Sequence, residues 1–230
     1  MTAPRPTSTD TSGTRATDLD VWSDFVCGHC YYGTRRIVAA LALLPDPDAF
    51  RLRWRSFQLD PRPAGARPSG DLYDYLAQFN GSRAAGRAAM DRIGAVAAAD
   101  GLPFRPDRAR PGNTTDAHRL VHLARREGRD TETVLSLYTA YWTEGRPIAD
   151  RTVLRELAAD VGLDARRAQE VLDGDEFTAE VAEDQQRAAH LGVMGVPALV
   201  VGDRWSLGAT ATAEAIAAEL HLLSRERNEA

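Results

Sequence analysis

The sequence predicts an α/β fold that is interrupted by an all-helical insertion. Strand patterns occur in the first quarter of the chain and again near its C-terminus, while the stretch between them carries helical patterns with almost no strand signal. We therefore predict a discontinuous α/β domain over residues 19–60 and 177–226, with an all-helical domain over residues 61–176 inserted into it. The 230 residues of the chain are enough for one such domain with its insertion.

The first part of the α/β domain has the pattern of a strand–helix–strand unit. Residues 19–25 alternate apolar and polar side chains, which predicts a strand. Residues 31–44 carry apolar side chains at helical spacing, and Pro45 and Pro47 end that helix. Residues 50–57 alternate again and predict a second strand. Together these segments form a βαβ unit.

The predicted insertion begins after a segment rich in proline and glycine, which marks a boundary. Its helical segments are rich in Ala, Leu, Arg and Glu. They comprise residues 71–80, 83–100, 115–127, 131–144 and 150–160.

The last part of the chain returns to an α/β pattern. It predicts, in order, a helix, a strand, a short partner strand and a closing helix, followed by a frayed end. These segments cover residues 177–191, 197–202, 204–207, 212–223 and 224–230. Residues 1–18 are rich in Thr, Ser, Pro and Ala without the apolar stretch of a secretory signal, so we expect a disordered leader on a cytoplasmic protein.

The composition excludes several classes of protein. A hydrophobic share of 43% beside a charged share of 27% is that of a globular chain, not a fibrous one. No apolar run is long enough to span a bilayer, and a net charge of −5 without a basic block argues against a nucleic-acid partner. The sequence contains no lysine, which excludes lysine Schiff bases and P-loop lysines.

Cys27 and Cys30 are the only cysteines, and they stand between the first predicted strand and its helix. A cysteine at a helix start faces unpaired backbone N–H groups and the positive end of the helix dipole, which favours the thiolate. We therefore expect Cys27 to be the more exposed, nucleophilic thiol and Cys30, one turn later, the buried resolving thiol. Gly28 is expected to leave the Cys27 sulfur accessible, and a protonated His29 adds a positive charge beside it.

Two other interpretations of the cysteine pair stay open. His118 and His122 stand four residues apart on a predicted helix and could complete a zinc site. The two cysteines could also be ordinary core residues. The position between a strand and a helix favours a redox dithiol over both.

A second motif stands at the start of the late apolar strand, where Val196 precedes Pro197. A proline at the first residue of a strand is tolerated because no hydrogen bond needs to be donated there. A cis bond would place the Val196 backbone beside Cys27 as a docking edge for an extended partner chain. An ordinary trans proline at a strand edge is the alternative.

These residues, together with further matching stretches, resemble the DsbA-like thioredoxin-fold family, in particular its FrnE-like cytosolic branch. The matching stretches, which span nearly all of the folded chain, are residues 23–31, 57–61, 113–120, 140–145, 192–197 and 208–209. The resemblance implies a thioredoxin-like fold with a helical insertion, a Cys27 nucleophile, a resolving Cys30 and a cis-Pro197. The sequence departs from the branch's common CPWC motif at Gly28 and His29.

The resulting prediction is an enzyme, a DsbA-like thiol–disulfide oxidoreductase that also suits disulfide isomerisation, since its Gly-His pair matches that of protein disulfide isomerase. It acts on protein or small-molecule thiols and disulfides, needs no metal or cofactor, leaves glutathione open as a co-substrate, and is compatible with an oligomer. The main alternative is a glutathione-dependent isomerase or transferase, similar to kappa-class glutathione transferases or 2-hydroxychromene-2-carboxylate isomerases, acting on a small aromatic or polyketide-like molecule. Those relatives typically carry serine at the position of Cys27. A further alternative is a non-enzymatic binding module that needs neither thiol.

Two polar residues are candidates for acid–base or substrate-lining roles. Asp24 lies three residues before Cys27 and could accept a proton from Cys30, although we favour a helix cap or a surface acid, the commoner roles for Asp there. His118 could face the redox centre across the domain junction, but we favour a histidine that is hydrogen-bonded within the helical domain. Aromatic residues could line a substrate groove, although core packing is commoner for such residues. These are Trp54, Phe57, Tyr141 and Trp142.

Overall fold

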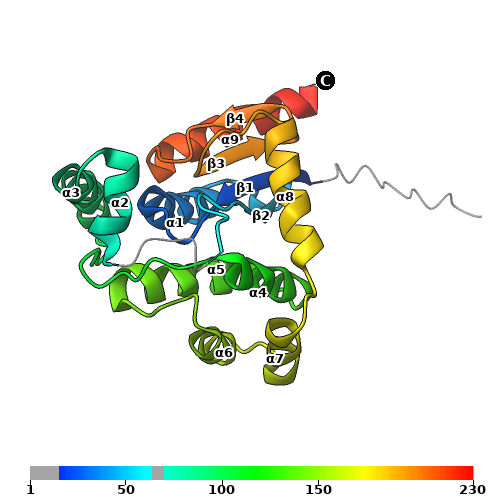
Figure 1. Cartoon of the computed structure of the whole chain (residues 1–230). Helices are drawn as coiled ribbons and strands as arrows, with labels where there is room; N and C mark the ends of the chain where they lie inside the picture. The colour runs from blue at the N-terminus through cyan, green and yellow to red at the C-terminus, as the bar shows by residue number, and fades with distance from the viewer. Residues whose placement is uncertain (1–15, 64–69, 230) are drawn as a thin grey trace, which may run out of the picture.

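The computed structural model describes residues 16–63 and 70–229, which form a four-stranded mixed sheet surrounded by helices (Figure 1). The strands of the described chain are β1 (Thr17–Ser23), β2 (Phe50–Ser56), β3 (Ala198–Val201) and β4 (Trp205–Leu207). Their order across the sheet is β2-β1-β3-β4, with β1 parallel to β2 and antiparallel to β3. The β1–β2 pair is the predicted βαβ unit, because two parallel neighbours need a crossover helix between them.

The helices of the described chain divide into those that lie outside the segment between β2 and β3 and those that lie within it. The first group contains α1 (Gly28–Ala42), the short 3₁₀ helix η1 (Pro47–Ala49) and α9 (Ala213–Glu229). The second group contains α2 (Leu72–Asn80), α3 (Arg83–Ala99), α4 (Thr115–Arg126), α5 (Asp130–Thr139), the π-helix η3 (Ala140–Glu144), α6 (Arg151–Asp160), α7 (Ala165–Asp173) and α8 (Thr178–His190).

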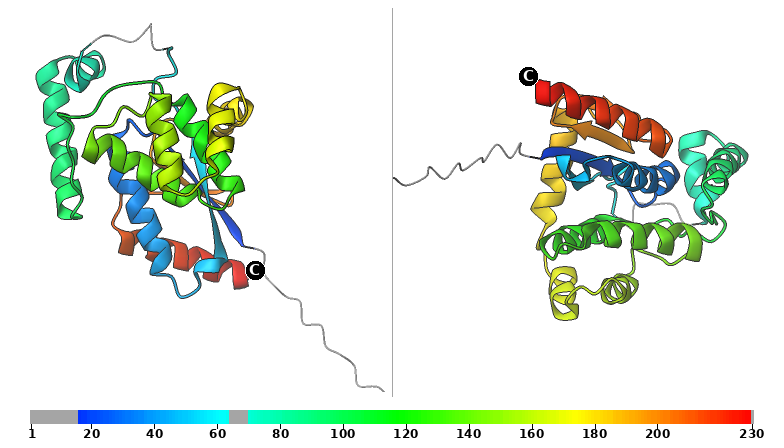
Figure 2. Two further views of the ribbon diagram at one scale, coloured as in Figure 1. Left: turned by 90° about the horizontal axis from the view of Figure 1, so that it is seen from below. Right: turned by 180° about the vertical axis from the view of Figure 1, so that it is seen from behind.

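The helices between β2 and β3 surround the sheet on several sides. In Figure 1, α4 and α5 lie below the sheet with α6 and α7 farther out, while α8 crosses the end of the sheet and contacts β2. Helices α2 and α3 pack together at the opposite end, near α1 (Figures 1 and 2), and α3 contacts α1. Part of the helical segment therefore reaches the start of α1.

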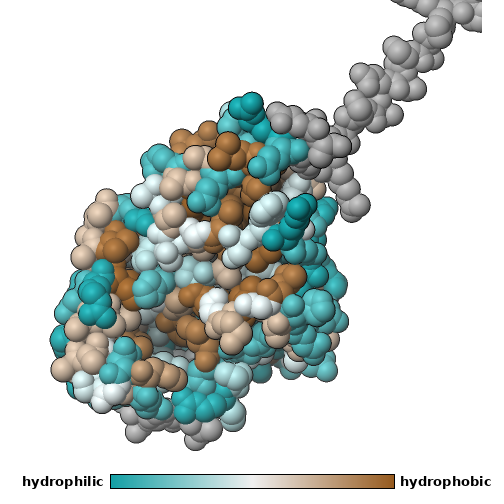
Figure 3. All heavy atoms as spheres, turned by 90° about the horizontal axis from the view of Figure 1, so that it is seen from above, coloured by the Kyte–Doolittle hydropathy of each residue, from teal (hydrophilic) through white to brown (hydrophobic). Residues whose placement is uncertain are grey.

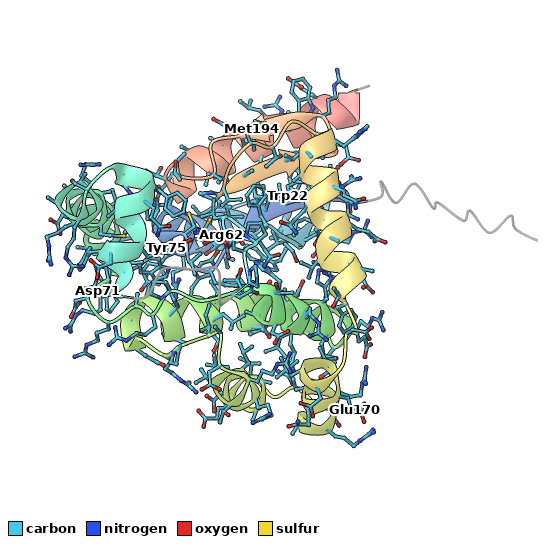
Figure 4. All side chains as sticks on the ribbon, viewed as in Figure 1. Trp22, Arg62, Asp71, Tyr75, Glu170 and Met194 are labelled. Atoms are coloured by element: carbon cyan, nitrogen blue, oxygen red, sulfur yellow. The ribbon has the colours of Figure 1, made fainter. Side chains whose placement is uncertain are left out.

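Strand β1 is buried on both faces from Leu19 to Ser23, although its side chains alternate between apolar and polar. Its polar Asp20 is completely buried and accepts hydrogen bonds from Arg53 and Arg55. On the same strand Trp22 lies against α8, where its Nε1 donates to the backbone oxygen of Asp184 at 2.8 Å (Figure 4). Because this face is covered, Asp20 meets the arginines of β2 instead of water.

Most predicted elements exist with ends shifted by a few residues, and two predictions need correction. The closing helix α9 continues to Glu229, so the expected frayed end over residues 224–230 is wrong for the described residues. The helix predicted over residues 131–144 is divided between α5 and η3, since its last turn opens into a π-helix.

Most buried apolar side chains of the sheet and of the inserted helices form one continuous cluster, from Leu19 and Val21 in β1 to Leu120 in α4 and Leu154 in α6. Trp22, Ala188 and Val200 form a second, smaller cluster. The boundaries that the sequence suggests at residues 60 and 177 stay predictions, because the helices share the larger cluster with the sheet. The predicted disordered leader lies outside the described residues, apart from residues 16–18, and residues 17 and 18 already belong to β1.

The exposed apolar side chains of the described surface are scattered. They include Leu43, Leu59, Phe79, Met194, Trp205 and Leu222. Figure 3 shows separate apolar patches among hydrophilic ones on the face that it presents. In the described residues, every helix is too short or too polar to pass through a bilayer.

Candidate active site

The turn between β1 and α1 holds Cys27 in place through several hydrogen bonds. The Cys27 amide donates to the Asp24 backbone oxygen at 3.0 Å, and the Tyr138 hydroxyl donates to the same oxygen at 3.1 Å. The indole of Trp142 donates to the Phe25 backbone oxygen at 3.0 Å. Because Tyr138 and Trp142 belong to the helices between β2 and β3, these helices fix the backbone that carries the reactive cysteine.

Cys27 and Cys30 lie as predicted relative to each other, although both are buried. Cys27 is the N-cap residue of α1 with 7% of its surface exposed, whereas Cys30 in the first turn is 0% exposed. Both thiols are free in this structure. A sulfur at a helix N-cap lies next to the unpaired N–H groups of the first turn.

The pKa values of the two thiols are shifted in opposite directions. The pKa of Cys27 falls to about 6, chiefly because the Cys30 thiol donates a hydrogen bond to the Cys27 sulfur. Burial opposes this fall, while His29 and the Cys30 backbone amide support it. Burial raises the pKa of Cys30 well above that of an ordinary thiol, and its hydrogen bond to Cys27 raises it further. Near neutral pH the pair therefore holds one thiolate, on Cys27, and one thiol, on Cys30.

His29 lies on the exposed side of the motif, where it supports the Cys27 thiolate. The pKa of His29 is raised, first because of its side-chain hydrogen bond to Cys27. Its ring also packs edge-on against Tyr32, with centroids 6.0 Å apart. The imidazolium and the thiolate thus stabilise each other's charged forms.

The Val196–Pro197 peptide bond is cis, as the sequence predicts from its combination with the cysteine motif. The Cys27 sulfur lies 3.5 Å from the Val196 backbone oxygen, to which it donates when protonated, so the expected neighbourhood of these two residues is confirmed. Gly33 allows α1 to approach this loop, because a Cβ there would lie 2.8 Å from the Ala209 oxygen and 3.2 Å from Pro197 Cγ. Sequence reasoning missed Gly33, although a glycine inside a helix is itself a signal of close packing.

Asp24 and His118 are both buried beneath the motif, which corrects the roles favoured from the sequence. Asp24 is neither a surface acid nor a helix cap: its Oδ2 accepts the Leu59 amide at 2.8 Å. Its Oδ1 lies 3.5 Å from His118 Nε2, and neither of these two buried atoms has a hydrogen-bond partner among the described residues. The His118 ring packs on Phe25 at 4.8 Å, so His118 faces the redox centre and not only its own helical segment.

Gly28 has a different role from the one expected. It is buried, and a Cβ on it would lie 3.1 Å from two side-chain carbons of Ile93 and 3.5 Å from Phe104. The inserted segment therefore covers the start of α1, and Gly28 provides room for this cover rather than open access to Cys27. Nothing in the sequence pattern of Ile93 or Phe104 indicates that they lie over the motif.

The structure does not support the zinc interpretation, because His118 and His122 face different partners instead of one shared site. His122 Nε2 lies 3.1 Å from the Ser56 hydroxyl and 3.3 Å from Asp184, whereas His118 faces Asp24. Among the residues that the structure describes, no cluster of three or more His, Cys, Asp or Glu side chains is arranged to hold a metal ion.

The aromatic residues considered for a substrate groove are mainly core residues. Trp54, Tyr141 and Trp142 are buried, and only Phe57 is partly exposed. Trp142 stacks on Phe104 with centroids 4.8 Å apart. Phe104, which lies over Gly28, is therefore packed against the core.

Comparison with known proteins agrees with this architecture. A family model described as the DSBA-like thioredoxin domain matches residues 18–219. A probable DsbA oxidoreductase from Streptomyces coelicolor is 33% identical with a TM-score of 0.83, covering 91% of this chain and 90% of that one. The comparison with curated proteins found no match.

Two more distant structures share the fold. The cytosolic disulfide reductase DsbM from Pseudomonas aeruginosa, also solved with GSH, is 22% identical with a TM-score of 0.67, covering 91% of this chain and 99% of that one. A 2-hydroxychromene-2-carboxylate isomerase is 17% identical with a TM-score of 0.68, covering 92% and 98%. Given a thioredoxin fold, a dithiol at the start of α1 and a family match across nearly all of the described residues, the chain belongs to the DSBA-like thioredoxin family of oxidoreductases.

Proposed function

We propose that this protein is a thiol–disulfide oxidoreductase in which Cys27 is the nucleophile and Cys30 the resolving thiol. The observation that carries the proposal is the opposite shift of the two thiol pKa values, to about 6 for Cys27 and well upward for Cys30. A thiolate attacks a disulfide, and a protonated partner thiol can complete the exchange once it loses its proton.

The reaction balances as two successive exchanges. The Cys27 thiolate attacks one sulfur of a substrate disulfide, which forms a mixed disulfide and releases the first substrate thiolate. Cys30 then loses its proton and attacks the Cys27 sulfur, which forms the Cys27–Cys30 disulfide and releases the second thiolate. The substrate gains two electrons and the dithiol loses them; the reverse sequence oxidises a substrate dithiol.

Asp24 is the proposed proton acceptor for Cys30. The backbone of Asp24 lowers the pKa of Cys30 and the charge of its carboxylate raises it, which supports a carboxylate in the neighbourhood of this thiol. Asp24 is buried, and its Oδ1 has no hydrogen-bond partner among the described residues. This supports a role for Oδ1 as the atom that accepts the proton of Cys30.

We place the activity in the cytoplasm, where a dithiol of this kind is transient and catalytic rather than structural. DsbM, which shares the fold, is named as a cytosolic disulfide reductase. The cis-Pro197 loop is the proposed docking edge for an extended substrate backbone, because the Val196 oxygen already contacts the Cys27 sulfur. Disulfide isomerisation needs no further group, since a mixed disulfide at Cys27 can be attacked by another substrate thiol.

The test is to trap the mixed disulfide. Reduced Cys30→Ala protein is mixed with a disulfide substrate such as insulin and analysed by non-reducing mass spectrometry. A stable adduct at Cys27, absent from Cys27→Ala, supports the proposal. If Cys30→Ala forms no adduct but keeps the full glutathione-dependent turnover of the wild type, the result would support a glutathione-dependent isomerase or transferase instead. If the protein keeps its activity without either thiol, the result would support a binding module.

A further inference from the structure

A small pocket opens beside the redox motif, between α1 and α3. Its volume is about 270 Å³. It is lined by His29, Tyr32, Ala89, Arg92, Ile93 and Val96. The two helices that form it come from different parts of the chain. The cysteine motif stands at the start of α1, and α3 carries Ile93, which lies over Gly28. The pocket is smaller than most ligand sites, so it suits one arm of a small molecule rather than a peptide.

Two of its lining residues connect the pocket to the reactive sulfur. His29 lines the pocket, and its side chain is hydrogen-bonded to Cys27. Ile93 lines the pocket, and its side chain also covers Gly28, the residue next to Cys27. A molecule that contacts the His29 ring in this pocket is therefore linked to the Cys27 sulfur through that ring.

The lining contains cationic side chains and no carboxylate. Arg92 is exposed and takes part in no ion pair within the part of the chain that the structure describes. Of the acids on α3 and at its end, Asp100 pairs with Arg36 at 2.6 Å, and the charge of Asp91 raises the pKa of Tyr73. Arg36 itself lies over the Tyr32 ring, with its guanidinium carbon 4.9 Å from the centroid. The charges around the pocket therefore favour an anion.

We propose that this pocket binds the carboxylate of a small-molecule thiol or disulfide that exchanges with Cys27, with Arg92 as the residue that selects for negative charge. The inference rests on the proposed function, because it names the substrate class of the same redox centre. In the exchange, Cys27 attacks the sulfur of the small disulfide, the Cys27–substrate disulfide forms, and the other half leaves as a thiolate that takes a proton from water. Arg92 takes no part in these bonds and acts by holding the charged end of the substrate.

The experiment compares three small disulfides of similar size and different charge. Dithiodipropionate is anionic, hydroxyethyl disulfide is neutral and cystamine is cationic. Rate constants for the loss of the reduced protein, which begins with the attack of Cys27 on the probe, are measured by rapid acid quench and mass spectrometry. Each rate constant is divided by that of a free small thiol with the same probe, which removes the intrinsic reactivity of the probe.

The wild-type protein is expected to favour dithiodipropionate over cystamine. Arg92→Gln should slow the reaction with dithiodipropionate by about threefold and Arg92→Glu by about tenfold, the size expected for one partly solvated charge. Both variants should react with hydroxyethyl disulfide at the wild-type rate. Arg166→Gln, which removes an exposed arginine from the distant helix α7, should leave all three rates unchanged. High salt should reduce the preference, because exposed charges are screened.

The outcomes separate this inference from the proposed function. If hydroxyethyl disulfide forms neither a Cys27 adduct nor a Cys27–Cys30 disulfide in the wild type, the proposed oxidoreductase function is wrong. If it reacts in this way but Arg92→Glu reacts with dithiodipropionate as fast as the wild type, the function stands and the anion pocket is wrong. Equal normalised rates of the wild type with all three probes would also overturn the pocket.

Discussion

Asp24 Oδ1 and His118 Nε2 lie 3.5 Å apart beneath the redox motif, one at the end of β1 and the other on α4. Both side chains are almost completely buried, and these two atoms have no hydrogen-bond partner among the described residues. A buried polar atom without a partner costs free energy, so such a pair persists where the groups have a use in another state. A proton arriving from Cys30 would turn this close approach into a hydrogen bond.

The first prediction concerns Asp24. Asp24→Asn keeps an oxygen that can accept the Leu59 amide but removes the proposed proton acceptor. Resolution of the mixed disulfide by Cys30 should slow by about tenfold or more, as is usual for loss of a general base. The first exchange at Cys27 should keep its rate. Stopped-flow measurement of both steps checks this, and equal slowing of the two steps would contradict the assignment.

His118→Phe should affect the same step less. A phenyl ring can keep the packing on Phe25 at 4.8 Å while it removes Nε2 from Asp24. Because His118 acts through Asp24, resolution should slow by about threefold, and its dependence on pH should change while alkylation of Cys27 does not. An unchanged pH profile of resolution would show that His118 only packs in the core.

The pH dependence of Cys27 alkylation provides the third prediction. Because the pKa of Cys27 is lowered to about 6, the rate with iodoacetamide should rise as the pH increases through about 6 and then level off. Cys30, whose pKa is raised, should not react over this range. His29→Ala removes one of the groups that lower the pKa of Cys27, so the midpoint should move upward by about one unit.

The matched comparison for this prediction is Cys30→Ala. It removes the hydrogen bond that lowers the pKa of Cys27 most, so its upward shift should exceed that of His29→Ala. A larger effect of His29→Ala than of Cys30→Ala would reverse the order of causes described above.

The fourth prediction tests the close packing of Gly33. Gly33→Ala places a methyl group 2.8 Å from the Ala209 backbone oxygen, so α1 or the loop must move. Alanine is favoured over glycine in a helix by about 1 kcal/mol, but crowding of a packed site costs about 1–3 kcal/mol. Urea unfolding should therefore show a net loss of up to about 2 kcal/mol, from the difference of these two effects.

Gly195→Ala is the control for Gly33→Ala, because a Cβ at Gly195 meets no atom within 4 Å. Its free energy of unfolding should stay within about 0.5 kcal/mol of the wild type. If both variants have the same free energy of unfolding, the close packing of α1 against the cis-Pro197 loop does not depend on the absence of a side chain at Gly33.

The fifth prediction is a coupling between Gly28 and Ile93. Gly28→Ala in the wild type should be destabilising by about 1 kcal/mol or more, because Ile93 lies 3.1 Å from the added Cβ. In an Ile93→Ala background the same change should be neutral or stabilising, because the crowding is gone and alanine suits the first turn of α1. A double-mutant cycle from urea unfolding measures the difference, and additive effects would show that the two residues do not compete for space.

The sequence predicts the parts of this structure that depend on local pattern. The βαβ unit follows from alternation and helical spacing, and the places of Cys27 and Cys30 follow from the helix start between the strands. The cis bond before Pro197 is predicted only through its combination with the cysteine motif, since trans is the usual state of such bonds.

The features that the sequence does not predict depend on contacts between distant segments. Asp24 has the position of a surface acid in the sequence, but the Leu59 amide and His118 on α4 enclose it. Ile93 has the pattern of an ordinary core residue of α3, and only the placement of that helix beside α1 brings it over Gly28. Helical periodicity shows which face of a helix is buried, not which neighbour buries it.

The contact of Ile93 with Gly28 has a consequence for experiments that exchange the dipeptide between the cysteines. A larger residue at position 28, such as the proline of related motifs, would displace Ile93 and with it one wall of the neighbouring pocket. A reduction potential measured on such a variant would then reflect two changes at once, the electronic effect of the new dipeptide and the altered burial of the Cys27 sulfur. Dipeptide exchanges in this scaffold are therefore best made together with a compensating reduction in size at Ile93.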